Sequence, residues 1–108
     1  MQATEKIQEL QILEKNLQNL AMQKQAFQLE STESQNALEE IKKTSSDIFK
    51  VVGSIMLKAE KDETIKELEE KINLLNLRNS SIEKQEALIE NKAEELKSEI
   101  KKIIDSEK

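Results

Sequence analysis

Two long segments of the chain repeat their apolar side chains at alternating intervals of three and four residues. This spacing places the apolar side chains on one stripe of a helix and is typical of coiled coils. In the segment over residues about 3–43, seven of the ten stripe positions are apolar. In the segment over residues about 61–107, ten of twelve are apolar. The pattern therefore predicts two long amphipathic helices.

The two stripes are the a and d positions of a heptad repeat. In the first segment they are Leu10, Leu13, Leu17, Leu20, Lys24, Phe27, Ser31, Ser34, Leu38 and Ile41. In the second they are Ile65, Leu68, Ile72, Leu75, Asn79, Ile82, Glu86, Ile89, Ala93, Leu96, Ile100 and Ile103. We expect the helices to pair antiparallel within one chain, because their polar interruptions then coincide. A contact between Lys24 and Glu86 is a hypothesis, and the alternative is that both side chains extend into water.

The helical spacing stops over residues about 47–59, where the chain reads D-I-F-K-V-V-G-S-I-M-L-K-A. Runs rich in β-branched residues on both sides of a Gly-X pair predict a β-hairpin, and glycine in the first turn position favours a type II′ turn. A turn at Gly53-Ser54 places Val52 opposite Ile55 and Val51 opposite Met56. One face then carries Ile48, Val52, Ile55 and Leu57, and the other carries Phe49, Val51 and Met56.

Both faces of the predicted hairpin are largely apolar. An isolated two-stranded hairpin is marginally stable in water, and its edges carry unpaired backbone groups. The rest of the chain offers only helices, so we expect strands of other subunits to complete the sheet. The alternative is a turn whose apolar residues cap a helical bundle. The candidate assembly residues are Ile48, Phe49, Val51, Val52, Gly53, Ile55, Met56 and Leu57.

Apolar residues also gather near both ends of the chain, on and beside the stripes. Helix ends fray, and an exposed apolar patch usually marks a binding surface. Scattered apolar side chains are also common on protein surfaces, which is the alternative interpretation. We call this candidate binding surface the tip cluster; it comprises Ile7, Leu10, Ile12, Leu13, Ile100, Ile103 and Ile104.

Charge and composition exclude several classes of function. Charged residues make up 36% of the 108 residues, the net charge is −5, and Arg78 is the single arginine. A nucleic-acid-binding protein would carry a basic surface, so we expect no nucleic-acid partner. The N-terminal residues are too polar for a signal peptide, and no apolar run reaches membrane-spanning length. We therefore expect no membrane partner and a soluble, cytoplasmic protein, in agreement with the absence of cysteine.

The side chains that most often perform catalysis are missing. There is no histidine and no cysteine, which removes the commonest general base, the thiol nucleophile and the soft metal ligands. One glycine cannot form a phosphate-binding loop. Carboxylates such as Glu67 are spaced for ion pairs with lysine on helix faces. We expect no catalytic residues, no cofactor and no metal site, and we interpret the chain as a non-enzyme.

The order helix, hairpin, helix, with the motif I-F-K-V-V-G-S-I-M-L-K, resembles the prefoldin β-type subunit and is most similar to the archaeal form. The hairpin pattern of that family is matched by Phe49, Lys50, Val52, Gly53, Ile55, Met56, Leu57 and Lys58. The segment E-L-E-E-K at residues 67–71 corresponds to the start of the family's second helix. The chain departs from the family at Phe49, where tyrosine is common, and at Glu60, where threonine often caps the second helix.

This resemblance implies a mainly α fold: one prefoldin-like domain over residues 1–108, in which an antiparallel two-helix coiled coil is joined by a β-hairpin. It implies a hetero-hexamer of two α and four β subunits whose hairpins form β-barrels between subunits. It further implies capture of unfolded polypeptides at the coiled-coil tips without ATP, and their transfer to a group II chaperonin. The tip cluster would contact the client polypeptide, and the hairpin would drive assembly. The alternative is a structural coiled-coil adaptor or tether that oligomerises through its hairpin; a nucleic-acid-associated rod and an enzyme rank behind it.

Overall fold

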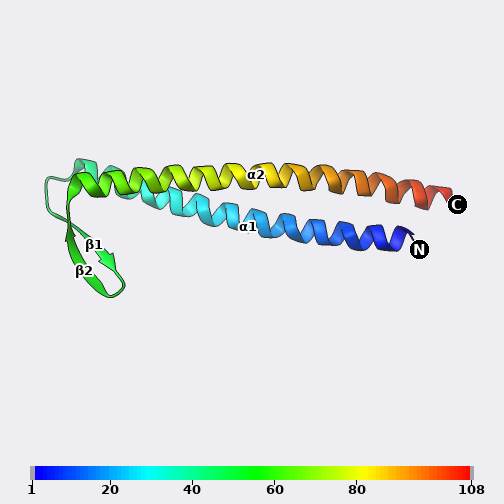
Figure 1. The fold of residues 1–108 in the computed structure, drawn as a ribbon, viewed down its shortest axis with the longest axis horizontal. Helices are drawn as coiled ribbons and strands as arrows, with labels where there is room; N and C mark the ends of the chain where they lie inside the picture. The colour runs from blue at the N-terminus through cyan, green and yellow to red at the C-terminus, as the bar shows by residue number, and fades with distance from the viewer. Residues whose placement is uncertain (1, 108) are drawn as a thin grey trace. The chain divides into compact units, whose positions relative to one another are not determined.

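The computed structural model describes residues 2–107 and contains two long helices joined by a hairpin (Figure 1). The elements are α1 (Gln2–Lys43), β1 (Ile48–Val52), β2 (Ile55–Ala59) and α2 (Lys61–Ser106). Each bound lies within one residue of the bound predicted from the sequence. The predicted fold class, two antiparallel helices joined by a β-hairpin, is confirmed.

The chain divides into two compact units. One, here called the hairpin unit, is Ala26–Asn79 and contains both strands. The other, here called the terminal unit, comprises the residues up to Gln25 together with those from Ser80 onward. Each unit therefore contains one part of α1 and one part of α2.

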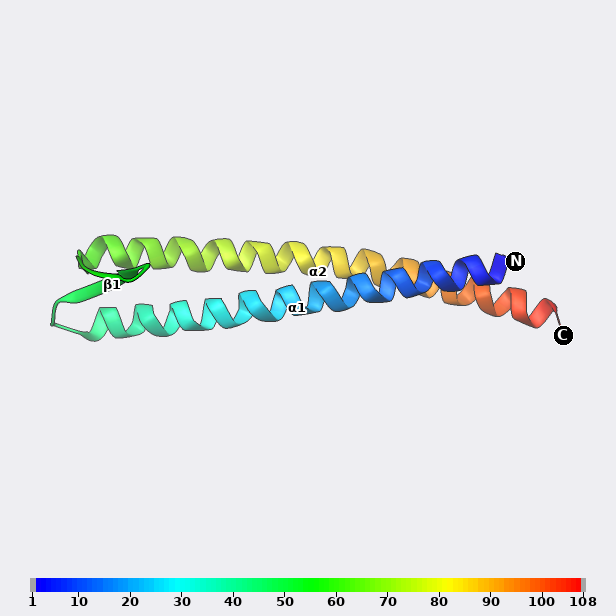
Figure 2. The same cartoon turned by 90° about the horizontal axis from the view of Figure 1, so that it is seen from below.

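Ion pairs between α1 and α2 give the direction of helix pairing in each unit, and Figure 2 shows the course of the two helices. In the hairpin unit, Lys42 pairs with Glu69 at 3.6 Å and Glu30 pairs with Lys71 at 3.1 Å. In the terminal unit, Glu9 pairs with Lys92 at 3.8 Å, and Lys6 pairs with Glu99. In each unit, the earlier residue of α1 pairs with the later residue of α2, so the helices are antiparallel in both units.

The heptad stripes form the interface between the helices. Every a and d position named from the sequence is buried or half-buried, whereas nearly all other described helix positions are exposed. The buried apolar side chains are Leu75 in the hairpin unit and Ile82, Ala93 and Leu96 in the terminal unit. A two-helix pair can bury only this narrow seam, so its stability depends on a few side chains.

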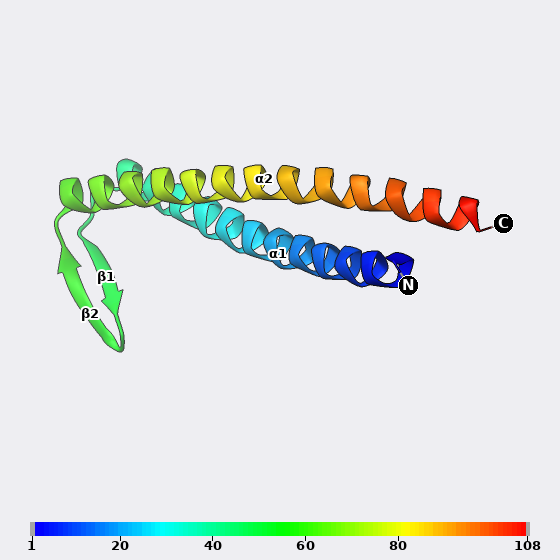
Figure 3. The same cartoon turned by 45° about the vertical axis from the view of Figure 1, so that its right-hand side comes forward.

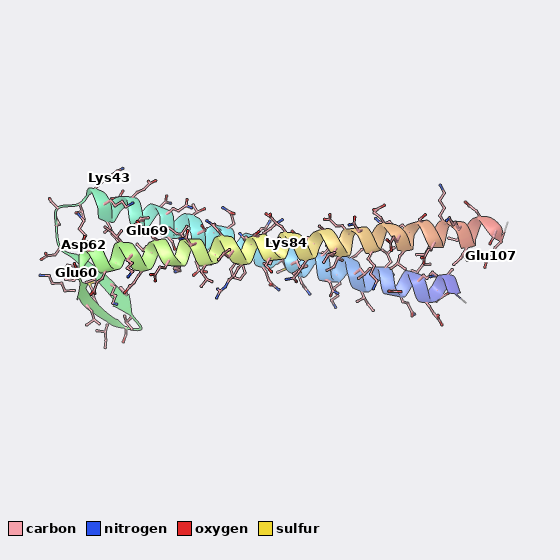
Figure 4. All side chains as sticks on the ribbon, turned by 45° about the horizontal axis from the view of Figure 1, so that its top comes forward. Lys43, Glu60, Asp62, Glu69, Lys84 and Glu107 are labelled. Carbon is pink, nitrogen blue, oxygen red and sulfur yellow. The ribbon has the colours of Figure 1, made fainter. Side chains whose placement is uncertain are left out.

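The start of α2 is capped by an unusual residue, Glu60. The backbone N–H of Glu63 donates to Glu60 Oε2 at 3.2 Å, and the N–H of Thr64 donates to the Glu60 carbonyl at 3.0 Å. A capping carboxylate at this end also complements the helix dipole. Figure 4 shows Glu60 beside Asp62 at the beginning of α2. The structure therefore places the cap of α2 at Glu60.

Polar side chains interrupt the seam in the hairpin unit. Ser31, Ser34 and Asn79 are all buried, with exposed fractions of 9% or less. Among the described residues, Ser31 Oγ and Asn79 Oδ1 are buried without a hydrogen-bond partner. A buried polar atom that lacks a partner loses its hydration without compensation. This part of the seam is therefore weaker than a fully apolar one.

Replacing Asn79 with leucine should raise the free energy of unfolding by about 1–2 kcal/mol, because it removes an unpaired buried amide and adds apolar burial. Urea denaturation followed by circular dichroism measures the change. Asn73→Leu is the matched control, since Asn73 is exposed on the same helix and its substitution should change stability by less than about 0.5 kcal/mol. A lower stability of N79L would contradict this expectation and show that the Asn79 side chain stabilises the seam.

Candidate assembly surface and tip cluster

The hairpin has the strand register that a turn at Gly53-Ser54 produces. Val52 lies opposite Ile55, Val51 opposite Met56, and Ile48 opposite Ala59. The φ of Gly53 is 63°, whereas the φ of Ser54 is not positive. This combination of φ values fits a type II′ turn, whose first central residue needs a left-handed φ that glycine adopts without steric cost.

Both faces of the hairpin are open to solvent in the single chain. Figure 3 shows the strands extending away from the helices of the same unit. The exposed apolar side chains on the strands have exposed fractions between 46% and 67%. They are Phe49, Val51, Val52, Ile55, Met56 and Leu57. Ile48 and Ala59, at the base of the strands, are half-buried.

The edges of this sheet are also unpaired. Within residues 2–107 the sheet consists of β1 and β2 alone, so the outer backbone groups of each strand have no strand beside them. Such edges are templates for pairing with strands of another chain. An exposed ion pair, 3.4 Å long, joins Lys58 to Asp47 across the base of the hairpin. Apolar faces and open edges together describe a surface that other strands can complete.

The tip cluster lies entirely in the terminal unit. Ile7, Ile12 and Ile104 are exposed by 39%, 61% and 46%. The other four members, Leu10, Leu13, Ile100 and Ile103, are stripe residues and half-buried. The pairing of Lys6 with Glu99 joins the turns of α1 and α2 that carry Ile7 and Ile100. The cluster thus combines a half-buried seam with exposed isoleucines beside it.

The predicted contact between the two polar seam residues is present. Lys24 Nζ donates to Glu86 Oε1 at 2.8 Å. This hydrogen bond raises the pKa of the Lys24 ammonium, while its partial desolvation lowers it. The hydrogen bond from Lys6 to Glu99 raises the pKa of Lys6 in the same way. Each pair satisfies a charge that would otherwise lie unpaired beside the seam.

The raised pKa of Lys24 makes its contribution to stability dependent on pH. Because the folded state binds this proton more tightly than the unfolded state, the contribution is complete below about pH 10.5 and is lost as the pH rises through the folded pKa. We expect Lys24→Gln to lower the urea midpoint at pH 8, and the difference from the parent chain to shrink by pH 11. Lys84→Gln, on an exposed position, should show no such convergence. An unchanged difference at pH 11 would contradict the assignment to the Lys24–Glu86 pair.

No group of three or more histidine, cysteine, aspartate or glutamate side chains is placed to hold a metal ion within the described part of the chain. Neither α1 nor α2, over the same residues, has a stretch apolar and long enough to cross a bilayer.

Comparison with known proteins identifies the family. The prefoldin subunit family matches residues 4–107. The chain belongs to the prefoldin family. It is 37% identical to the prefoldin subunit beta of Thermococcus kodakarensis over 98 residues, which cover 89% of this chain and 84% of that protein. It is 35% identical to the prefoldin subunit beta of Methanospirillum hungatei, covering 92% and 84%.

The fold agrees with this membership. The chain superposes on the crystal structure of the prefoldin beta subunit from Thermococcus strain KS-1 with a TM-score of 0.86, at 35% identity and over 94% of this chain and 91% of that one. The predicted resemblance to a β-type prefoldin subunit is confirmed. The prefoldin family is a family of molecular chaperones, so the chain is a subunit of a chaperone.

Proposed function

We propose that the chain is the β-type subunit of a cytoplasmic hetero-hexamer of two α and four β subunits. The hexamer captures unfolded polypeptides at the tip clusters without ATP and passes them to a group II chaperonin. Membership of the prefoldin family supports assembly with other prefoldin subunits in a hexamer. The observation that carries the proposal is the hairpin with two exposed apolar faces.

Burial of the hairpin would drive assembly. Burying one large apolar side chain contributes about 1.5–3 kcal/mol, and six such side chains on the strands are at least 46% exposed. Association itself costs about 4–15 kcal/mol, so contact through one hairpin face would leave little net affinity. Burying both faces and pairing both edges favours a closed sheet with strands from several subunits, which is the β-barrel of the proposal.

The tip cluster would bind clients weakly at each subunit. The three exposed isoleucines of the tip cluster offer a small apolar surface to a flexible chain with apolar side chains. Several such patches in one assembly raise the effective concentration for the second and later contacts. A client would then be held by many weak contacts, each of which can be released separately.

The first test is the mass of the chain in solution, alone and mixed with a prefoldin α subunit, by light scattering after size exclusion. The proposal expects a complex of two α and four β chains. A chain that stays monomeric or dimeric with every α subunit offered would favour the structural tether, in which the hairpin is a dimerisation clip.

The second test concerns the tips. We expect the triple variant Ile7→Ser, Ile12→Ser and Ile104→Ser to lose most of its ability to suppress aggregation of a chemically unfolded protein. Its matched control replaces three exposed apolar residues on the outer helix faces, Met22, Leu29 and Leu77, with serine. The control should keep its activity and its assembly. Equal activity of the tip variant and the control would remove the tip cluster from the proposal.

A further inference from the structure

A groove in the terminal unit is lined mainly by carboxamides. Its volume is about 310 Å³, at the lower end of ligand-binding pockets in proteins. Four of its six lining residues are amides and the other two are seam residues. The lining residues are Asn16, Asn19, Leu20, Gln23, Gln85 and Ile89. Figure 4 labels Lys84, the residue that precedes Gln85 on α2.

The groove interrupts a row of interhelical ion pairs. Glu9 and Lys92 pair across the seam at 3.8 Å. Asn16 lies seven residues after Glu9 in α1, and Gln85 lies seven residues before Lys92 in α2, so these two residues occupy the same heptad positions one repeat away. Both line the groove. Coiled coils often carry an ion pair at such positions. Here two uncharged amides, Asn16 and Gln85, occupy the positions of the ion pair.

These amides are free to bind a ligand. Among the residues that the structure describes, the side chains of Asn16, Asn19 and Gln23 make no hydrogen bond, and Gln85 has one long contact of 3.5 Å with Ser81. Each carboxamide offers an N–H₂ donor and a carbonyl acceptor. Two of the charges adjacent in sequence to lining residues, Lys24 and Glu86, are paired with each other at 2.8 Å. The lining side chains themselves are uncharged, and the four amides among them offer both donors and acceptors.

Peptide backbone has the same chemistry, because each residue presents one N–H and one C=O. Along α1, Asn16 and Gln23 are seven residue steps apart and so about 10 Å apart along the helix axis, the length of about three residues of extended chain. A folded protein pairs its backbone groups internally, whereas an unfolded chain exposes them. The groove thus matches the backbone of a short extended segment of unfolded polypeptide.

The groove is continuous with the tip cluster. Ile12, a tip residue that is 61% exposed, precedes Asn16 by four residues and so lies on the same face of α1. On α2, Leu88 is 71% exposed and lies three residues after Gln85. Apolar side chains of a client could contact Ile12 and Leu88 while its backbone lies between them.

We propose that the carboxamide groove binds the backbone of client polypeptides, as a second contact next to the tip cluster. Asn16, Asn19, Gln23 and Gln85 exchange hydrogen bonds with about three residues of extended chain, independent of the client's side chains. This inference rests on the proposed capture of unfolded polypeptides. It gives the chaperone a means of recognising clients of any sequence.

The test uses the full chain, in the assembly that light scattering finds, and two probes. The first probe is a fluorescent 15-residue peptide of glycine, serine, threonine and leucine. The second is the same peptide with alternate central backbone nitrogens methylated, which removes hydrogen-bond donors. The groove variant is Asn16→Ala with Gln23→Ala, and its control is Gln18→Ala with Gln25→Ala, two exposed amides of α1 outside the groove. Alanine preserves the helix, and fluorescence anisotropy gives the affinities.

We expect the groove variant to bind the unmodified peptide about tenfold more weakly, as the loss of two hydrogen bonds implies. Its loss of affinity for the methylated peptide should be smaller, because methylation has already removed the peptide N–H groups that donate to the side-chain carbonyls of Asn16 and Gln23. The difference between the two losses isolates the backbone contact. The serine variant of the tip cluster should weaken both peptides.

Equal effects of the groove variant on both peptides, or no effect on either, would overturn the backbone contact and leave the tip contact standing. A changed mass of the groove variant in light scattering would also overturn it, because the groove would then be an interface between chains. Failure of the parent chain to bind either peptide would overturn the capture of unfolded polypeptides together with this inference.

Discussion

Glutamate at both Val51 and Met56 should abolish assembly with the α subunit while leaving the helices folded. The two residues lie opposite each other on neighbouring strands and are each 67% exposed in the single chain. In a closed barrel their face would be buried against other strands. Two like charges in that position must lose their hydration and also repel each other, which costs several kcal/mol. The association constant should fall by more than about 100-fold.

Light scattering with the α subunit measures this loss, and circular dichroism verifies the helices. The matched control places the same two charges on α1, as Gln18→Glu and Gln25→Glu, at exposed helix positions. The control should assemble like the parent chain. If the hairpin variant assembles as well as the control, the exposed faces of the hairpin do not form the interface, and the family's mode of assembly would need another surface.

The helices and the place of the hairpin could be predicted from the sequence because each depends on a short-range rule, whereas the strand register stayed open until the turn was located. The heptad spacing determines which side of a helix faces the seam, and even the polar stripe residues Lys24 and Asn79 follow it. The hairpin register depends on one turn, since glycine is the residue that adopts the φ of 63° at position 53. Once that turn is placed, the two-residue period of a strand assigns every side chain to a face.

Other features of the site could not be predicted because they depend on how particular side chains fit together. A heptad assigns Asn16 and Gln85 to the edge of the seam but does not reveal that a groove of about 310 Å³ remains between them. Likewise, a polar residue at a stripe position can be hydrogen-bonded or unpaired, and Ser31 Oγ proves to be unpaired among the described residues. The resemblance marked position 60 as a capping position, but that the Glu60 carboxylate itself makes the cap follows from its 3.2 Å contact with the Glu63 N–H.

Leu75→Ala should destabilise the chain by about 2–4 kcal/mol, the cost of removing a buried leucine and leaving a cavity. Leu75 is 2% exposed and is the one buried apolar side chain of the hairpin unit within the residues described. The other buried stripe residues of that unit, Ser31, Ser34 and Asn79, are polar. The seam of the hairpin unit therefore has no second buried apolar residue to compensate for the loss.

Urea denaturation measures the total effect, and hydrogen exchange locates it. Because the terminal unit keeps Ile82, Ala93 and Leu96 buried, its amides should stay protected in L75A while those of the hairpin unit exchange faster. Leu77→Ala is the control, since Leu77 is 69% exposed two residues away and its loss should change stability by less than about 0.5 kcal/mol. A uniform loss of protection in both units would mean that the two helices unfold as one cooperative element. A loss confined to the hairpin unit would mean that the polar seam lets the helices separate next to the strands, where the proposed assembly with other subunits would hold them together.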